Sequence, residues 1–238
     1  NMLDLCKGEE REKIIEKTVS GQGIISDITA KFNPAIEFTE KDLVSMLYYL
    51  GYLTIQDNIA GYPKLNIPNM VMKEIYSDYF LRVLNQNFSM SSNINYSELA
   101  LEIALDGKID RIVDLMQTYL QHLSNRDYMN FDEKYVKLIF YCIAMNLDIF
   151  RVKSEMEVQR KYPDILLIPK DTTKGYKSVM IEFKYLKKGE ENKLAEKQEE
   201  ARKQIEEYAT FEEIKGIPNL SKYTVVAVND KIYVEKIL

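Results

Sequence analysis

The spacing of the apolar residues changes near residue 146, and this change constrains the fold more than any other feature. Up to that point apolar residues recur at helical spacing, as in residues 131–145. Beyond it the chain has three strand-like runs, a long charged helical stretch and two more strand-like runs. In order these are residues 148–154, 163–168, 178–184, 190–209, 223–228 and 232–234. The predicted order from residue 131 is therefore α-β-β-β-α-β-β, which predicts an α/β (α+β) domain.

The first part of the chain is predicted to be mainly helical. Helical spacing is found in residues 9–19 and again after Thr39, which is an N-cap candidate with an acidic residue three positions later. A short β-like run, a turn at Asp57-Asn58, an extended segment and a long helix follow, and Asn69 is the N-cap candidate of that helix. This order predicts a helical, winged-helix-like module over residues 1–90. A plain helical adaptor is the alternative.

A second domain is predicted over residues 97–238. Residues 86–96 are polar and lack periodicity, so we place a linker there. Two helices, 97–106 and 108–123, are expected to hinge at Asp106-Gly107 before the mixed α and β region begins.

Composition places the chain among ordinary soluble globular proteins. It has 238 residues, 46% of them hydrophobic and 29% charged. It contains neither an apolar run long enough for a transmembrane helix nor a secretory signal, and its two cysteines make neither a disulfide scaffold nor a zinc site. These features predict a cytoplasmic protein without a membrane partner. Because the chain begins with Asn1, we expect it to be part of a longer protein.

The acidic net charge of −5 is unevenly distributed. Residues 1–130 contain 12 basic and 18 acidic side chains, whereas residues 131–238 contain 20 basic and 19 acidic ones. The surplus of acid therefore lies in the first part, and the overall charge does not exclude a nucleic-acid partner for the second.

Three charged residues on two neighbouring predicted strands form the candidate catalytic site. Alternation along 178–184 places Glu182 and Lys184 on one face. Asp164 begins the preceding strand, so a hairpin would bring it close to Glu182. Two carboxylates can then hold one divalent cation, and the Lys184 ammonium can position a water molecule and offset charge in the transition state. Set against this, Glu-x-Lys on an exposed strand face occurs often by chance.

These residues resemble the motif of the PD-(D/E)XK nuclease superfamily. Pro163-Asp164 and Glu182-Phe183-Lys184 carry the resemblance, and the order of elements from 131 to 228 is similar to its restriction-endonuclease-like core, α-β-β-β-α-β with a central mixed sheet. Further stretches from about residue 40 onward resemble bacterial proteins that join an AAA-ATPase-like domain to such a nuclease domain. They are Tyr52-Leu53-Thr54, Ile67-Pro68-Asn69, Tyr162 with Asp164-Ile165, Ile168-Pro169-Lys170-Asp171 and Gln204-Ile205.

The resemblance implies roles for individual residues. Asp164 and Glu182 would bind Mg²⁺ or Mn²⁺, and Lys184 and Gln204 would be catalytic. Glu133 at the start of the first core helix matches a further acidic position, and a favourable place for an acid at a helix N-terminus is the simpler explanation for it. Glu157 matches another acidic position without a clear role. Arg151, Lys153, Arg160 and Lys161 lie near Asp164 in sequence and are candidates for binding nucleic acid.

The sequence departs from the family at three points. A glycine that often precedes the aspartate is missing, because the approach here is Arg160-Lys161-Tyr162-Pro163. A histidine common in the first core helix is absent, and the only histidine, His122, is interpreted as a surface or packing residue. No P-loop occurs, so an ATPase domain would lie upstream of Asn1.

The sequence therefore predicts a metal-dependent nuclease that hydrolyses phosphodiester bonds, with DNA favoured over RNA as substrate. A catalytically inactive nuclease-fold module for binding or regulation, attached to an AAA-type ATPase, is the alternative.

Overall fold

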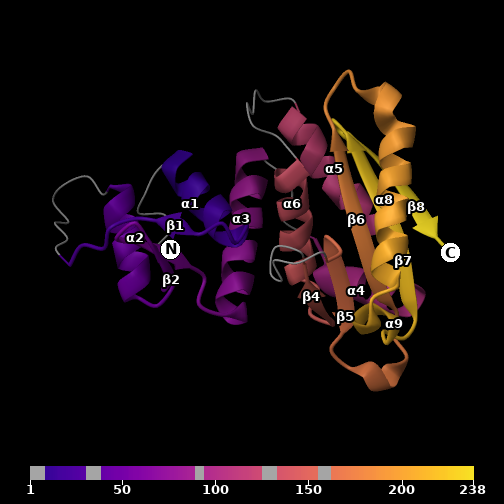
Figure 1. The fold of residues 1–238 in the computed structure, drawn as a ribbon, viewed down its shortest axis with the longest axis horizontal. Helices are drawn as coiled ribbons and strands as arrows, with labels where there is room; N and C mark the ends of the chain where they lie inside the picture. Colours follow the sequence, from indigo (N-terminus) through magenta and orange to yellow (C-terminus); the bar gives the residue numbers. More distant parts are fainter. Residues whose placement is uncertain (1–8, 31–38, 89–93, 125–132, 155–161) are drawn as a thin grey trace. The chain divides into compact units, whose positions relative to one another are not determined.

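The computed structural model describes residues 9–30, 39–88, 94–124, 133–154 and 162–238 (Figure 1). The chain divides into two compact units, Asn1–Val83 and Leu84–Leu238. None of the helices in the described ranges is long and apolar enough to cross a membrane.

The first unit consists of helices around a small antiparallel sheet. Its elements are α1 (Glu9–Val19), β1 (Ile24–Ile25), α2 (Glu40–Tyr49), β2 (Thr54–Ile59), β3 (Tyr62–Asn66) and α3 (Met70–Phe88), whose last turns belong to the second unit. The strand order is β1-β3-β2. The predicted N-caps are confirmed: the side chain of Thr39 accepts a hydrogen bond from the backbone N–H of Asp42, and that of Asn69 from Met72.

The turn between β2 and β3 differs from the prediction. We expected it at Asp57-Asn58, but β2 continues to Ile59, which pairs with Tyr62, so that Ala60 and Gly61 form the turn. Both have positive φ, 52° and 90°, as a two-residue hairpin requires. The side-chain Oδ1 of Asn58 accepts a hydrogen bond from the N–H of Gly61. Asn58 therefore stabilises the turn from the strand and does not form it.

The second unit follows the predicted order. Its helices are α4 (Tyr96–Asp106), α5 (Asp110–Ser124), α6 (Glu133–Met145), α8 (Leu194–Ala209) and the unpredicted α9 (Glu212–Lys215). Its strands are β4 (Phe150–Lys153), β5 (Ile165–Pro169), β6 (Ser178–Leu186), β7 (Leu220–Val228) and β8 (Lys231–Ile237), and two short 3₁₀ turns are η2 (Thr172–Lys174) and η3 (Glu191–Lys193). It is the predicted α+β domain.

The five strands form one mixed sheet in the order β4-β5-β6-β7-β8. The pairs are antiparallel except for β6 and β7, which run parallel and are connected through α8. The predicted hairpin of β5 and β6 is confirmed, with Ile165 opposite Ile181 and Leu167 opposite Val179. The parallel pair requires a long crossover connection, and the helical stretch at 190–209 provides it.

The sheet is covered on both faces, which buries its central strand β6. Phe183 packs against Phe140 of α6, with ring centroids 4.7 Å apart. On the other face Met180 packs against Ile205 of α8. Figure 1 shows α6 and α8 on opposite sides of the sheet. Because successive residues of a strand point to opposite faces, the even-numbered residues of β6 lie under α8.

A glycine is required between α4 and α5, where the sequence predicted a hinge. Gly107 ends α4 with a φ of 67°, and a Cβ there would lie 2.6 Å from the Oγ of Ser221. Its carbonyl accepts a hydrogen bond from the buried hydroxyl of Tyr223 on β7 at 2.7 Å. Only glycine combines this backbone conformation with this close approach, so the position ties the helices to the sheet.

Candidate active site

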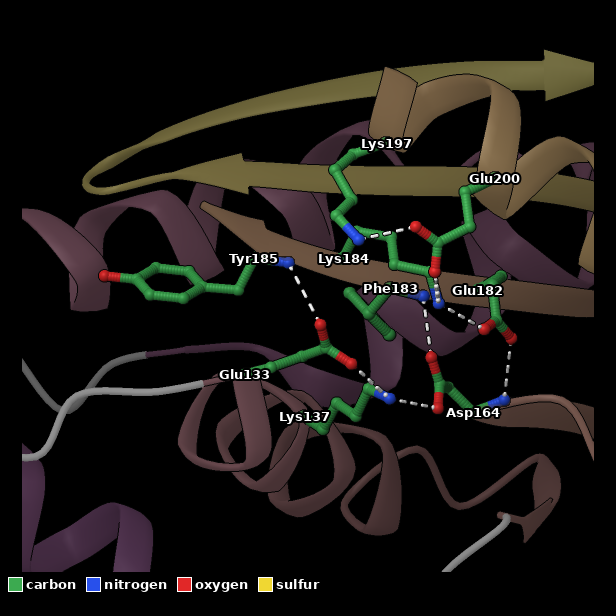
Figure 2. A network of polar contacts seen from close by, with 9 residues as sticks. All are labelled: Glu133, Lys137, Asp164, Glu182, Phe183, Lys184, Tyr185, Lys197 and Glu200. Carbon is green, nitrogen blue, oxygen red and sulfur yellow. Dashed lines mark hydrogen bonds and ion pairs between the residues drawn. The ribbon is translucent and has the colours of Figure 1, made fainter. Parts of the chain in front are cut away.

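The candidate site lies just before the start of β5, where β6 continues beyond its pairing with β5 but remains paired with β7 (Figure 2). The regular pairing of the two strands begins at Ile165 opposite Ile181. Beyond it the N–H of Phe183 has no strand partner on this side and instead donates a hydrogen bond of 2.8 Å to Oδ2 of Asp164. The carboxylate of Asp164 thus accepts the backbone hydrogen bond at the fork, the point where β5 and β6 separate. The topology of the sheet therefore fixes the position of this carboxylate.

Glu182 and Lys184 lie next to Asp164 on β6. The ammonium of Lys184 donates to Oε1 of Glu182 at 2.9 Å, and the backbone N–H of Asp164 lies 3.4 Å from Oε2 of the same carboxylate. The three residues are only 2–5% exposed. The chance explanation, a Glu-x-Lys pair on an exposed strand face, therefore does not apply, because α8 covers this face.

Helix α6 contributes a second ammonium group. The Nζ of Lys137 lies 2.6 Å from Oδ1 of Asp164 and 2.8 Å from Oε1 of Glu133, one turn earlier on the same helix. Oε2 of Glu133 in turn accepts a hydrogen bond from the N–H of Tyr185 on β6 at 3.3 Å. These contacts connect the start of the helix to two strands.

Helix α8 contributes a further carboxylate. Oε1 of Glu200 lies 3.9 Å from the ammonium of Lys184, and its other oxygen lies 2.5 Å from that of Lys197. Lys184 therefore stands between Glu182 and Glu200. An ammonium placed between two carboxylates is held in position by both.

The electrostatics of the site raise the pKa values of Glu182 and Lys137. Burial, together with the negative charge of Asp164, raises the pKa of Glu182 to about 7, although Lys184 and Lys137 act in the opposite direction. Burial by itself would lower the pKa of Lys137, but the attraction of Asp164 and hydrogen bonds to Asp164 and Glu133 outweigh it and raise the pKa. Lys137 is therefore a permanent cation, whereas Glu182 changes its protonation near neutral pH.

One known family is similar to the part of the chain that contains this site. Residues 131–236 match the PD-(D/E)XK nuclease superfamily. Over these residues the chain is similar to that superfamily. No curated protein matches the chain. The matched range begins just before α6 and ends in β8, so it includes the sheet, both covering helices and the three motif residues Asp164, Glu182 and Lys184.

The donor chemistry of the PD-(D/E)XK site fits a hard divalent cation. Asp164, just before β5, and Glu182 on β6 bring two carboxylates into one buried cluster. Burial and the charge of Asp164 raise the pKa of Glu182, and a bound cation would offset both effects. Among the described residues no group of three or more acidic, histidine or cysteine side chains is arranged to hold a metal. Mg²⁺ commonly takes only one or two carboxylates and completes its shell with water and substrate oxygens, so two are sufficient.

The other predicted site residues are less closely associated with the cluster. Gln204 lies one turn after Glu200 on α8, but no hydrogen bond joins it to the three motif residues, and its Oε1 is buried without a partner among the described residues. Arg151 and Lys153 are exposed on β4. The pairing of Lys153 with Leu166, and of Leu166 with Met180, places their side chains on the same sheet face as Glu182.

Several predicted residues lie outside the described part of the chain or away from the site. Arg160, Lys161 and Glu157 fall in residues 155–161, which the structure does not describe. His122 is exposed on α5, in agreement with its interpretation as a surface residue.

Two helical residues that contact the motif in the described part of the chain, Lys137 and Glu200, were not predicted from the sequence. Lys137 had a signal: it is the last charged residue of α6 before an uninterrupted apolar run from Leu138 to Met145, all of it buried. A lysine beside such a run needs a partner. The sequence contained no such indication for Glu200, because α8 contains many glutamates and most of them are solvated.

Proposed function

We propose that this chain is a divalent-metal-dependent nuclease that hydrolyses phosphodiester bonds in DNA. The observation that carries the proposal is the buried cluster of Asp164, Glu182 and Lys184 at the fork between β5 and β6, with Lys184 within 2.9 Å of Glu182. The similarity of residues 131–236 to the nuclease superfamily supports the same reaction class.

Each residue of the cluster has a distinct task in the proposed reaction. Asp164 and Glu182 would hold Mg²⁺ or Mn²⁺, which supplies positive charge to the scissile phosphate and makes a bound water more acidic. Lys184, held between Glu182 and Glu200, offsets the negative charge that develops on the phosphate oxygens. Hydrolysis forms one P–O bond from water and breaks the bond to the leaving sugar oxygen, which takes up a proton. Because the site is buried beside α8, these charges act in a low dielectric.

Cleavage of matched DNA and RNA substrates tests the proposal. The full chain is incubated with plasmid DNA and with DNA and RNA oligonucleotides of one sequence, in Mg²⁺, Mn²⁺ or EDTA. We expect DNA cleavage that requires metal, and a rate about 10²–10³-fold lower for Lys184→Ala. Lys174→Ala, in the exposed turn η2 at the other end of the strands, should cleave like the wild type.

Two outcomes would contradict parts of the proposal. Equal cleavage by the wild type and Lys184→Ala would refute the assignment of the site. Faster cleavage of RNA than of DNA would refute the substrate but leave the site intact.

Arg151→Ala combined with Lys153→Ala should weaken DNA binding, and the loss should shrink as salt rises, because exposed basic residues act mainly through the phosphates.

One observation favours the alternative of an inactive nuclease-fold module. All four carboxylate oxygens of Asp164 and Glu182 already have donors within the chain, two of them the ammonium groups of Lys137 and Lys184. Under this alternative the chain binds DNA without cleaving it. Fluorescence anisotropy with labelled DNA, with and without metal, distinguishes the two functions: binding that metal leaves unchanged, without products, supports the inactive module.

The domain assignment and the ATPase connection remain proposals. The winged-helix-like module over residues 1–90 would link the nuclease domain over residues 97–238 to an upstream AAA-type ATPase in a cytoplasmic protein. The resemblance of stretches such as Ile67-Pro68-Asn69 to bacterial proteins of that organisation supports this.

A further inference from the structure

We propose that Lys137 is a built-in cation of the active site, which positions Asp164 and limits the site to one divalent ion. This inference rests on the proposed metal-dependent nuclease and specifies how its site handles metal. Lys137 is a positioning residue in this proposal, because it acts through Asp164 and not on the substrate.

The contacts of Lys137 orient the carboxylate that would bind metal. Its Nζ lies 2.6 Å from Oδ1 of Asp164, while the N–H of Phe183 holds Oδ2 at 2.8 Å (Figure 2). Both oxygens of Asp164 are thus fixed, one from the helix and one from the strand. Glu133, at 2.8 Å, holds the ammonium from its other side.

These contacts go beyond an ordinary ion pair on a helix surface. A Glu–Lys pair four residues apart is usually exposed and contributes little. The side chain of Lys137 is 18% exposed and reaches a carboxylate that is 2% exposed on a different element. An ammonium group in this position is difficult to displace, because its removal would leave two neighbouring carboxylates uncompensated.

The charge of the site supports a single ion. The network in Figure 2 contains four carboxylates, on Glu133, Asp164, Glu182 and Glu200, and three ammonium groups, on Lys137, Lys184 and Lys197. With all of these groups charged, as a bound metal ion would favour, its net charge is −1. One divalent ion brings it to +1, which balances one phosphodiester, whereas two ions would bring it to +3.

The position of the Lys137 ammonium group explains why a second divalent ion is excluded between Asp164 and Glu133. Two-metal phosphodiesterases hold their ions about 3.5–4 Å apart between shared carboxylates. Here Lys137 already bridges Asp164 to Glu133, the next carboxylate along the helix side of the site. A second divalent ion at this bridge would meet a fixed positive charge at close range.

Manganese binding to the full chain without substrate tests the inference. Titration calorimetry and the spin-resonance signal of free Mn²⁺ both count bound ions. We expect one ion per chain for the wild type and for Lys137→Arg, which keeps the charge, and two for Lys137→Ala, in which Asp164 and Glu133 are left without their cation. Lys134→Ala removes an exposed lysine from the same helix and should bind one ion.

The metal dependence of cleavage provides a second measurement. At Mn²⁺ concentrations well below saturation, the rate should rise with the first power of Mn²⁺ concentration for the wild type and with about the second power for Lys137→Ala. Two ions bound to the wild type would overturn this inference but not the proposed nuclease. One ion bound to a folded Lys137→Ala would also overturn it. Should Lys137→Ala fail to fold, two ions bound to Lys137→Arg would be the contrary result. A wild type that binds no ion overturns the proposed function as well.

Discussion

The two sheets of this chain differ in which side chains they bury. The five-stranded sheet buries charged side chains, whereas the three-stranded sheet leaves apolar ones exposed. In the five-stranded sheet, the central strand β6 buries Glu182 and Lys184 at 2% and 5% exposure. In the three-stranded sheet, all six residues of the edge strand β2 are exposed, although two of them, Ile55 and Ile59, are apolar.

The position of a strand in its sheet, and not the polarity of its residues, accounts for this contrast. β6 has a neighbour on each side and a helix on each face. β2 has one neighbour, β3, and lies at the edge of its sheet. Charges inside a sheet require partners, which Asp164, Lys137 and Glu200 provide. Exposed apolar residues on an edge strand require none.

The largest expected effect is a difference between core truncations in the two sheets. Leu166→Ala removes a fully buried side chain of β5 that packs with Met180 of β6 and Ile205 of α8, and we expect it to lower the free energy of unfolding by about 2–5 kcal/mol. Ile55→Ala, at 45% exposure on β2, should change it by about 0.5 kcal/mol or less. Urea unfolding followed by far-UV circular dichroism measures both. Equal losses would mean that β2 is covered in solution, and the contrast would then fail.

The order of the strands could be predicted from the sequence because it depends on local patterns. Short apolar runs with turns between them identify β5, β6 and β7, and the long helical stretch at 190–209 implies a parallel crossover. The two-residue turn at Asn229-Asp230, with Asn229 at a φ of 54°, was also predictable, because asparagine tolerates this conformation.

The environment of the site could not be predicted in the same way. Alternation along β6 shows that Glu182 and Lys184 share a face, but not that α8 covers it. The contacts of Lys137 and Glu200 join helices to strands far apart in sequence, so they depend on how the layers pack. The turn at Ala60-Gly61 was missed for a local reason: Asp57-Asn58 is the stronger turn signal, and the left-handed conformation of Ala60 is unusual.

The pH dependence of stability should reveal the buried carboxylate of β6. The pKa of Glu182 is raised to about 7 by burial and by Asp164, so the metal-free folded protein binds its proton more tightly than the unfolded chain does. The stability that this tighter proton binding at Glu182 provides is therefore fully present below the ordinary glutamate pKa and is lost as pH rises to about 7.

Urea unfolding of the metal-free protein at a series of pH values measures this loss. The wild type should lose on the order of 2 kcal/mol relative to Glu182→Gln between about pH 4.5 and pH 7. Saturating Mn²⁺ should reduce the loss, since a bound cation favours the charged carboxylate. A wild type that gains stability over this range relative to Glu182→Gln would contradict the direction of the pKa shift.

The smallest expected effect concerns the residue at the N-terminal cap of one helix in each unit. In the first unit, Thr39 forms a reciprocal capping box with Asp42 at the start of α2. In the second, α8 begins after Lys193 without any side-chain cap, and its stability comes from packing of buried residues such as Ile205 on the sheet. Thr39→Ala should therefore cost about 1 kcal/mol, and Lys193→Ala about 0.5 kcal/mol or less. Thermal unfolding at one pH compares the two variants. A larger loss for Lys193→Ala would mean that local charge, and not burial against the sheet, fixes the start of the helix that covers the candidate active site.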